Sequence, residues 1–335
     1  MSGPRVSIVL PTYNRARFLP GATEAIERQS YRNWDLVVVD DGSTDDTQRV
    51  LESIRRDYGS KIKVISQVNR GAAGARNTGL DHATGDFVAF FDSDDTWLPD
   101  HLSQCMDVLL NTDDIDWVYG ASRFVDGETN TVLSENCFYD DNGGPLAFLE
   151  LRAVECGRAK VLPNREAAQV GVLQTLMCGL QTSVVRSSVF ATRRIPEFRV
   201  GEDQVLVIRA LLDGVRIAYL DEIHLIYRKH ADNVSASPSK SSAANIESRR
   251  ELLRAFRWLR ETISENDGLG PLVEKRISHE RFWGVGYPLQ DLGQFGAARK
   301  EYWDAIKCWP YSARQWKTLL ASYVKQFSRN FKTTG

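Results

Sequence analysis

Three carboxylates lie within four positions of the chain, at Asp92, Asp94 and Asp95. They follow the apolar run 87–91, which predicts a buried strand that ends in polar groups at its C-terminal tip. Open α/β sheets bind ligands at such tips. Carboxylates this close repel one another unless a cation offsets their charge, and their oxygens suit Mg²⁺ or Mn²⁺. The stretch is equally compatible with an acidic turn that caps the helix beginning at Pro99, so other segments must decide between the two.

The chain before and around this stretch alternates between strand and helix. Apolar runs predict strands at 6–10, 36–39, 62–65 and 87–92, with helices between them and after the last. Such alternation predicts a mainly parallel α/β sheet wound by right-handed crossovers. Further along, we expect a strand at 117–125, ordered structure at 180–185, a helix at 205–212 and two short strands at 217–220 and 223–227. The weak pattern of 140–168 is typical of a mobile active-site loop or an acceptor-binding insertion.

Polar and small residues occupy the loops that follow these strands. Residues 11–15 follow the first strand and 40–47 the second, where Ser43 or Thr44 can cap the next helix. Residues 69–79 form a small-residue loop entering a helix, which can point free N–H groups at an anion. Glycine and alanine also favour close packing of a helix on a sheet, so this segment alone leaves both interpretations open.

Length and composition are those of an ordinary globular protein. The 335 residues allow two domains, which we place at 1–240 and 241–335. A net charge of −2 argues against a dedicated nucleic-acid binder. Five scattered cysteines without a Cys-x-x-Cys pair indicate reduced thiols and no structural zinc. With no apolar N-terminal leader and no membrane-spanning run, we expect a cytoplasmic protein.

Taken together, the ordered motifs resemble those of glycosyltransferase family 2. Six segments carry the resemblance, in the order and spacing of the family: residues 11–15, 40–45, 69–79, 92–95, Glu202-Asp203, and 227–235. The resemblance implies a GT-A fold, in which a Rossmann-like, mainly parallel sheet is flanked by helices, followed here by a helical C-terminal region. It divides residues 1–240 into a nucleotide-sugar-binding part (about 1–125) and an acceptor-binding and catalytic part (about 126–240). It also implies a metal-dependent, inverting transfer of a sugar from a nucleotide diphosphate donor, a UDP-sugar above all, to a hydroxyl of a glycan or glycolipid, as in bacterial surface polysaccharide synthesis.

The resemblance also assigns roles to particular residues. It implies that Asp203 is the general base, with Glu202 as the competing candidate, and that one of the two also caps a helix. It implies a divalent metal ion, Mn²⁺ or Mg²⁺, held by Asp92, Asp94 and His230, although a lone histidine after a strand is more often structural. The nucleotide-sugar contacts that it implies are Pro11, Thr12, Tyr13, Asn14, Arg15, Asp40, Asp41, Asn69, Gly74, Arg76, Asp92 and Ser93.

Two other functions are compatible with a carboxylate cluster on an α/β sheet. A nucleotidyltransferase would need a Gly-rich basic signature after the first strand, where this chain has residues 11–14. A nucleotide-sugar-binding module without turnover would not need Asp203. Sugar identity, acceptor, linkage and oligomeric state have no readable signal in the sequence.

The C-terminal region has helical periodicity at 246–262, 272–283, 295–309 and 312–327, after a Ser/Lys/Pro linker at 237–242. In the last helix apolar residues form a stripe and basic residues stand around it, as in a helix lying on an anionic membrane surface. A helix packed on the protein with a solvated basic face gives the same pattern. A membrane contact would place the protein at the inner face of the cell membrane and suit a lipid-linked acceptor. The stripe consists of Trp316, Leu319, Leu320, Tyr323, Val324, Phe327 and Phe331.

Overall fold

The computed structural model describes residues 3–230, 233 and 242–332, with side chains up to Val324. The chain divides into two compact units, each described here by itself. The first contains Met1–Glu197 and Glu202–His230, and the second contains Phe198–Gly201 and Ala231–Gly335. The expected boundary at residue 240 lies close to this division, and most of the expected linker at 237–242 lies outside the described residues.

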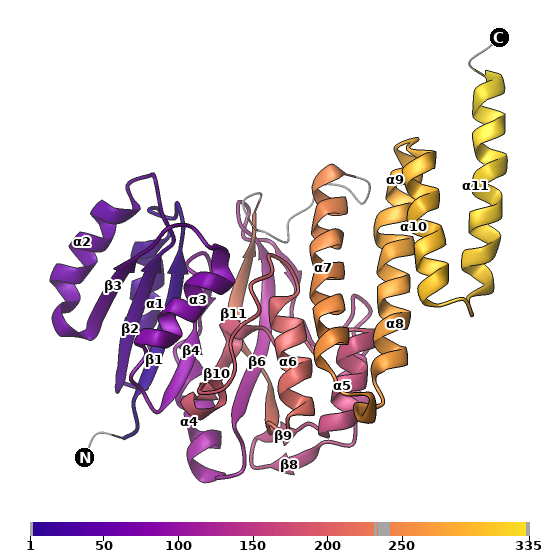
Figure 1. Ribbon diagram of the computed structural model, residues 1–335. Coiled ribbons are helices and arrows are strands. Elements are labelled where there is room, and N and C mark those ends of the chain that lie inside the picture. Colours follow the sequence, from indigo (N-terminus) through magenta and orange to yellow (C-terminus); the bar gives the residue numbers. More distant parts are fainter. Residues whose placement is uncertain (1–2, 231–232, 234–241, 333–335) are drawn as a thin grey trace. The chain divides into compact units, whose positions relative to one another are not determined.

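The first unit is built on one mixed sheet of 11 strands (Figure 1). In spatial order its main strands are β3 (Ile62–Ser66), β2 (Trp34–Asp40), β1 (Val6–Thr12), β4 (Phe87–Phe90), β10 (Ser183–Arg186), β6 (Trp117–Asp126), β11 (Ile217–Lys229), β9 (Ala159–Val161) and β8 (Val154–Cys156). Two short strands complete it: β5 (Thr96–Trp97) pairs with β11, and β7 (Val132–Ser134) pairs with β6. Strands β1 to β4 are parallel to one another, and β10 runs antiparallel between β4 and β6.

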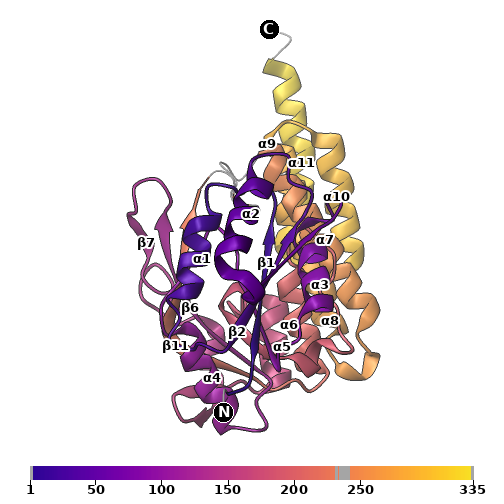
Figure 2. The same ribbon diagram turned by 90° about the vertical axis from the view of Figure 1, so that its left-hand side faces the viewer.

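Helices cover both faces of this sheet, which is why the inner strands are apolar along their whole length. Figure 2 shows α1 and α3 on opposite sides of β1. Leu36 and Val38 of β2 belong to the larger core cluster with α1, α2 and α4, whereas Val37 and Val39 pack with Ala75 of α3. The helices of this unit are α1 (Leu19–Glu27), α2 (Thr47–Tyr58), α3 (Gly71–His82), α4 (His101–Asn111), α5 (Asn164–Leu173) and α6 (Glu202–Leu212).

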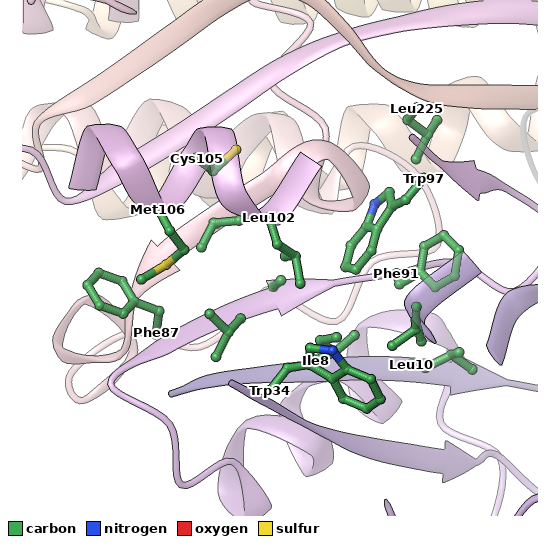
Figure 3. Close-up of a cluster of buried hydrophobic side chains, with 14 of the residues drawn as sticks. Ile8, Leu10, Trp34, Phe87, Phe91, Trp97, Leu102, Cys105, Met106 and Leu225 are labelled. Carbon is green, nitrogen blue, oxygen red and sulfur yellow. The ribbon is translucent and has the colours of Figure 1, made fainter. Parts of the chain in front are cut away.

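The larger core joins the first strand to the fourth helix. Figure 3 shows Ile8 and Leu10 of β1 facing the side chains of Phe91, Leu102 and Met106, all of which are buried. Burying a side chain of this size contributes about 1.5–3 kcal/mol. This cluster therefore holds β1, β4 and α4 in the arrangement that brings their polar ends together.

The predicted class, a mainly parallel sheet flanked by helices and followed by a helical region, is confirmed. Two local predictions are wrong. Residues 217–229 form a single strand, β11, because irregular pairing with β6 between Leu220 and Leu225 absorbs the polar residues that suggested a break. Helix α2 begins at Thr47 with Asp46 as its N-cap, so neither Ser43 nor Thr44 caps it. The weak segment 140–168 contains β8, β9 and the start of α5.

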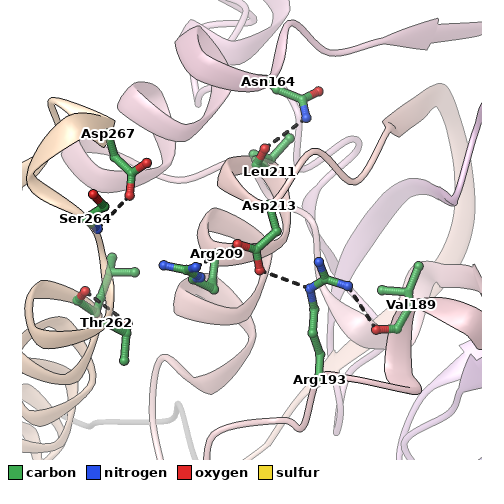
Figure 4. Close-up of polar contacts among 10 residues, drawn as sticks. Asn164, Val189, Arg193, Arg209, Leu211, Asp213, Thr262, Ser264 and Asp267 are labelled. Atoms are coloured by element: carbon green, nitrogen blue, oxygen red, sulfur yellow. Dashed lines mark hydrogen bonds and ion pairs between the residues drawn. The ribbon is translucent and has the colours of Figure 1, made fainter.

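The second unit is helical in its described part. Its helices are α7 (Ala243–Thr262), α8 (Gly270–His279), a π-helical stretch (Glu280–Gly286), α9 (Tyr287–Asp291), α10 (Phe295–Cys308) and α11 (Ala313–Lys332). The Ser242 side chain caps α7 by accepting from the Asn245 N–H at 3.1 Å. The turn before α8 is closed where the Ser264 N–H donates to Asp267 at 2.7 Å (Figure 4). None of the described helices has the length and apolar character needed to cross a bilayer.

Candidate active site

The acidic segment lies between β4 and β5, at the carboxyl end of the parallel strands. The Asp95 N–H donates to the Asp92 carbonyl at 3.2 Å, which folds the segment into a turn. On its far side, Trp97 of β5 pairs with Leu225 of β11. Ser93 and Asp95 are buried, and the carboxylates of Asp92 and Asp94 remain partly accessible. The segment is thus held at both ends and presents two carboxylates outward.

A buried arginine connects this segment to helix α6. Arg76 of α3 donates to Asp92 at 2.7 Å and pairs with Glu202 at 3.3 Å, with only 8% of its side chain exposed. Burial alone would lower the pKa of Arg76, but the charges of Asp92 and Glu202 outweigh it and raise the pKa. Arg76 is therefore a permanent cation between the two acidic segments.

The two acids that begin α6 have different surroundings. Burial and the neighbouring Asp203 raise the pKa of Glu202 to about 8, in spite of Arg76. Burial also raises the pKa of Asp203, opposed by the Gln204 N–H, which donates to it at 2.7 Å, and by Arg76. Two adjacent carboxyls in one buried site share protons as a pair. Glu202 faces Arg76, and Asp203 lines a cavity.

That cavity has a volume of about 190 Å³. Asp203 and Gln204 supply polar groups to it, and apolar atoms come from Leu176, Met177 and Val207. Met177 has a left-handed backbone conformation, with φ of 49°, which is uncommon for a non-glycine residue and is concentrated at functional sites. The expected ordered segment at 180–185 follows directly as a 3₁₀ turn and β10. A small cavity with a carboxylate in its wall can receive a hydroxyl group.

Helix α6 is anchored at its C-terminal end, which fixes Glu202 and Asp203 at the other. Figure 4 shows Arg193 reaching Asp213 with its Nε at 3.2 Å and the Val189 carbonyl at 3.2 Å. The Asn164 amide donates to the Leu211 carbonyl at 2.9 Å. The Asn164 contact supplies a partner for a carbonyl of the last turn, and Arg193 holds Asp213, the residue that follows the helix.

Asp94 lies on the other side of the acidic segment, with His230. The Asp94 carboxylate is 3.2 Å from Nε2 of His230 and 3.7 Å from Arg15. Burial and then Asp92 raise the pKa of Asp94, while Arg15 opposes the rise. The His230 ring stacks on Phe18, with ring centroids 5.4 Å apart, so its orientation is fixed.

These residues fit a divalent cation of the predicted kind. Asp94 and His230 offer adjacent oxygen and nitrogen donors, and one buried carboxylate oxygen of Asp95 has no hydrogen-bond partner in the described part of the chain. Burial and then the charges of Asp92 and Asp94 raise the pKa of Asp95 well above its usual range. Mg²⁺ is commonly held by one or two protein groups together with substrate phosphates. Asp92 is turned toward Arg76, so the structure brings together only two of the three predicted ligands.

The loops after β1 and β2 are joined through Asn14, whose own backbone is left-handed, with φ of 52°. The Thr44 N–H donates to Oδ1 of Asn14 at 2.8 Å, and the Asn14 N–H donates to Ser43 at 2.9 Å. Pro11 and Thr12 are buried as the end of β1, whereas Tyr13 is exposed and can stack on a planar ring. These predicted nucleotide contacts therefore lie together.

Asp40 is the last residue of β2 and Asp41 follows it, and their side chains make different contacts. Oδ1 of Asp40 accepts from the Ser43 N–H at 3.0 Å, while its Oδ2 is buried without a partner among the described residues. Asp41 accepts from Gln67 at 2.7 Å and from the Arg70 N–H at 2.8 Å. Asp40 therefore has an oxygen available to a ligand donor, and Asp41 holds the loop before α3.

The small-residue segment allows close approach of neighbouring groups at two of its glycines. A Cβ at Gly79 would lie 2.3 Å from Val9, so this glycine permits close packing of α3 on β1. A Cβ at Gly74 would lie 2.6 Å from the side chain of Arg70, which crosses this position to reach Glu197. Asn69 accepts from the Gly71 N–H at 3.2 Å at the start of the helix.

Some contacts within the candidate site have no signal in the sequence. Arg15 was predicted to touch the nucleotide, but its contact with Asp94 links it to the cation site. The Arg228 N–H, which donates to Asp95 at 3.3 Å, comes from 133 positions further along the chain. Only the left-handed backbone of Met177 marks this residue of the cavity as unusual, and the sequence does not reveal that conformation.

The comparisons with known proteins agree with this arrangement. Residues 7–156 match the family model described as glycosyl transferase family 2. The Escherichia coli protein "UDP-Glc:alpha-D-GlcNAc-diphosphoundecaprenol beta-1,3-glucosyltransferase WfgD" is 37% identical over 37% of this chain and 48% of its own. The matches span less than half the length of the first four curated relatives.

Two solved structures share the fold. TarS 1–349 of S. aureus, in complex with UDP-GlcNAc, has a TM-score of 0.61 at 20% identity, covering 97% of this chain and 88% of its own. The mannosyltransferase PcManGT of Pyrobaculum calidifontis, in complex with GDP-Man and Mn²⁺, has a TM-score of 0.56 at 19% identity, covering 97% and 87%. Sheet, loops and acidic segment define a GT-A protein. The match of residues 7–156 to the family model and the likeness to curated glycosyltransferases place this part of the chain with glycosyltransferase family 2, and the solved structures show the fold alone.

The buried Glu202 predicts a pH-dependent effect on stability. Its pKa rises from an ordinary 4.5 to about 8 in the fold, so between these values the folded chain holds the proton more tightly than the unfolded chain. The contribution of Glu202 to stability is therefore present below pH 4.5 and is lost as pH rises toward 8. We expect Glu202→Gln to gain stability relative to the parent between pH 5 and pH 8, measured by chemical denaturation.

Glu197→Gln is the control, because Glu197 forms only a half-exposed pair with Arg70. The stability difference between Glu197→Gln and the parent should be the same at pH 5 and pH 8. If the stability difference between Glu202→Gln and the parent were the same at pH 5 and pH 8, the Glu202 carboxyl would not be held protonated in the folded chain.

Proposed function

We propose that the protein is a metal-dependent, inverting glycosyltransferase. In this proposal it moves a sugar from a nucleotide diphosphate donor, a UDP-sugar by preference, to a hydroxyl of a glycan or lipid-linked acceptor in bacterial polysaccharide or glycoconjugate synthesis. The observation that carries the proposal is the bridge from Asp92 through Arg76 to Glu202. It places the acidic segment and the Asp203 cavity on either side of one buried cation, as donor and acceptor must flank a single reaction centre.

Asp203 is the general base in this mechanism. It lines the cavity that can receive the acceptor hydroxyl, and it titrates together with the adjacent Glu202 as a coupled pair. Asp203 accepts the proton of the acceptor hydroxyl while that oxygen attacks the anomeric carbon. The bond to the diphosphate breaks on the opposite face, and a single displacement inverts the anomeric configuration.

The leaving diphosphate takes up negative charge near Asp94 and His230. These two residues would hold Mn²⁺ or Mg²⁺, which supplies charge stabilisation for the leaving group when it is bound. Arg15, 3.7 Å from Asp94, adds a protein cation on the same side. Arg76 donates to Asp92 and orients it while the donor binds.

We assign the donor base to the loops after β1 and β2. Oδ2 of Asp40, which has no partner among the described residues, suits a ring N–H, and the exposed Tyr13 ring suits stacking. Uracil has such an N–H, and WfgD carries UDP-Glc in its name. The complexes of the two solved structures contain different nucleotides, so the fold alone does not decide between them.

A lipid-linked acceptor would bring the protein to a membrane surface, and α11 has a suitable face. One side of α11 is buried and includes Gln315, Leu319 and Ser322. The side chains of Leu320 and Val324 on the same helix are about two-thirds exposed. Trp303 and Trp316 pack edge to face and are also partly exposed. We assign this apolar face to peripheral contact with anionic lipids at the inner side of the cell membrane. Phe327 and Phe331 of the predicted stripe lie outside the described side chains.

Replacing Asp203 tests the base. Asp203→Asn removes the proton acceptor and keeps the shape, so we expect turnover to fall by a factor on the order of 10² or more with donor binding nearly intact. The measurement is release of nucleoside diphosphate at saturating donor, with donor affinity by calorimetry. Glu166→Gln, at an exposed position of α5, is the matched control. Unchanged turnover in Asp203→Asn would remove Asp203 from this role, and a parent that binds donor without releasing nucleoside diphosphate would favour a binding module.

Thermal stabilisation by donors tests substrate class and metal together. A ligand at about 100 times its dissociation constant adds about 2.7 kcal/mol of stability. We expect one UDP-sugar from a panel of UDP-, GDP- and dTDP-sugars to raise the melting temperature with Mn²⁺ but not with chelator. Asp94→Ala should abolish that metal-dependent shift, and Asp113→Ala, at an exposed site, should keep it. A full shift in Asp94→Ala would place the metal elsewhere.

Vesicle binding tests the membrane contact. We expect the parent to sediment with vesicles containing anionic lipid and not with purely zwitterionic ones. Leu320→Ser with Val324→Ser should reduce that binding several-fold without changing the melting temperature, because both side chains are exposed. Leu110→Ser, at an exposed apolar position of α4, is the control. Equal binding by all three proteins would assign the face of α11 to another contact.

A further inference from the structure

Three side chains outside the active site bring their metal-binding atoms together in the core of the first unit. Nδ1 of His101 lies 3.1 Å from Nδ1 of His224, and Sγ of Cys105 lies 3.8 Å and 4.0 Å from these two nitrogens. All three side chains are buried. Within the part of the chain that the structure describes, this is the one group of three potential ligand residues at such distances.

The separations are those of ligands around one small ion. Bonds of about 2.0–2.1 Å from zinc to nitrogen and about 2.3 Å to sulfur, in a tetrahedron, put two nitrogens about 3.3 Å apart and a nitrogen and a sulfur about 3.6 Å apart. The observed distances differ from these values by a few tenths of an ångström. A single ion therefore fits between the three atoms with only small side-chain shifts.

The orientation of each ligand is fixed by its surroundings. His101 and Cys105 are one helical turn apart on α4, so their side chains share a face. The Trp97 ring packs on His101 with centroids 4.5 Å apart, and Figure 3 shows Trp97 and Cys105 at the same core cluster. A Cβ at Gly120 would lie 2.1 Å from the His224 ring, so β6 carries a glycine where that ring passes.

We propose that His101, Cys105 and His224 form a structural zinc site that fastens α4 to β11. Two imidazoles and a thiolate select a borderline-soft transition metal over Mg²⁺, Ca²⁺ or Mn²⁺. This proposal revises the expectation of no structural zinc. That expectation rested on the lack of Cys-x-x-Cys pairs, and the sequence does not link Cys105 to His224, which lies 119 positions further along. The remaining coordination position takes a water molecule that enters with the ion.

The protonation states of the three groups are compatible with coordination. Burial lowers the pKa of His224 to about 4 and that of His101 well below its usual range, so both rings are neutral at pH 7 and have a lone pair to give. Burial raises the pKa of the Cys105 thiol, so zinc must displace its proton, which passes to the solvent. Nε2 of each ring has no hydrogen-bond partner among the described residues. Binding of zinc at Nδ1 therefore breaks no hydrogen bond at Nε2.

The position of the cluster gives the ion a definite effect. The Leu98 N–H donates to the His224 carbonyl at 2.9 Å, and Trp97 connects His101 to β5. Strand β5 directly follows the acidic segment. Zinc between α4 and β11 would therefore stiffen the support on which Asp94 and Asp95 are mounted.

Cobalt substitution tests the site without relying on enzyme activity. The purified chain is unfolded in guanidinium with a colorimetric zinc indicator, and we expect about one equivalent of zinc to be released per chain. After removal of zinc, Co²⁺ should give a thiolate-to-cobalt charge-transfer band in the near ultraviolet, together with the intense visible bands of four-coordinate cobalt. The Asp94 and His230 site has no thiolate and cannot give the ultraviolet band, so Asp94→Ala should retain it.

Cys105→Ala should lose the ultraviolet band and the released zinc, and Cys178→Ala, which removes another buried thiol, should keep both. Chelator should lower the melting temperature of the parent and leave that of Cys105→Ala unchanged. If Cys105→Ala does not fold, the spectrum of the parent chain still decides. A parent that releases no zinc and gives no thiolate band with Co²⁺ would overturn the proposal and leave a hydrogen-bonded histidine pair.

Discussion

The arrangement of the first unit depends on the burial of one positive charge. Arg76 cannot lose its proton in a protein, and removing a partner from a buried ion pair costs about 3–5 kcal/mol. Asp92 must therefore remain beside it, and Glu202, 110 positions further along at the start of α6, accepts a second hydrogen bond from the same guanidinium. One guanidinium thus determines both the direction of Asp92 and the placement of the Asp203 cavity. Gly79 makes this possible by letting α3 lie close to β1.

Periodicity predicted the first half of the fold well. Each strand from β1 to β4 is a short apolar run followed by a polar loop and a helix, so a local pattern is enough to locate it. The sequence could not predict that β10 is inserted antiparallel between β4 and β6, because strand order depends on contacts between distant segments. The division of residues 217–229 into two strands was wrong for a related reason. Pairing with β6 carries the backbone through the polar residues Asp221 and Glu222.

The sequence indicates which polar residues follow the strands, but not which of them contact one another. Residue types at strand ends indicated Asp40, Asp92 and Asp94, and the structure places them in the loops at the carboxyl end of the parallel strands. Sequence could not reveal that Asp92 faces Arg76, because that contact depends on the packing of α3 on the sheet. The cluster of His101 and His224 was missed since neither histidine has a partner nearby in the sequence that would suggest a pair.

The carboxylates of the acidic segment are compensated in two different ways, and this difference suits the proposed reaction. Asp92 has a permanent cation in Arg76, so its charge is balanced whether or not substrate is present. Asp94 and Asp95 have raised pKa values because burial and mutual repulsion are only partly offset. In the proposed reaction, a cation held by Asp94 and His230 would relieve that repulsion, so donor and metal would favour each other's binding. The same coupling would favour release of the metal together with the nucleoside diphosphate.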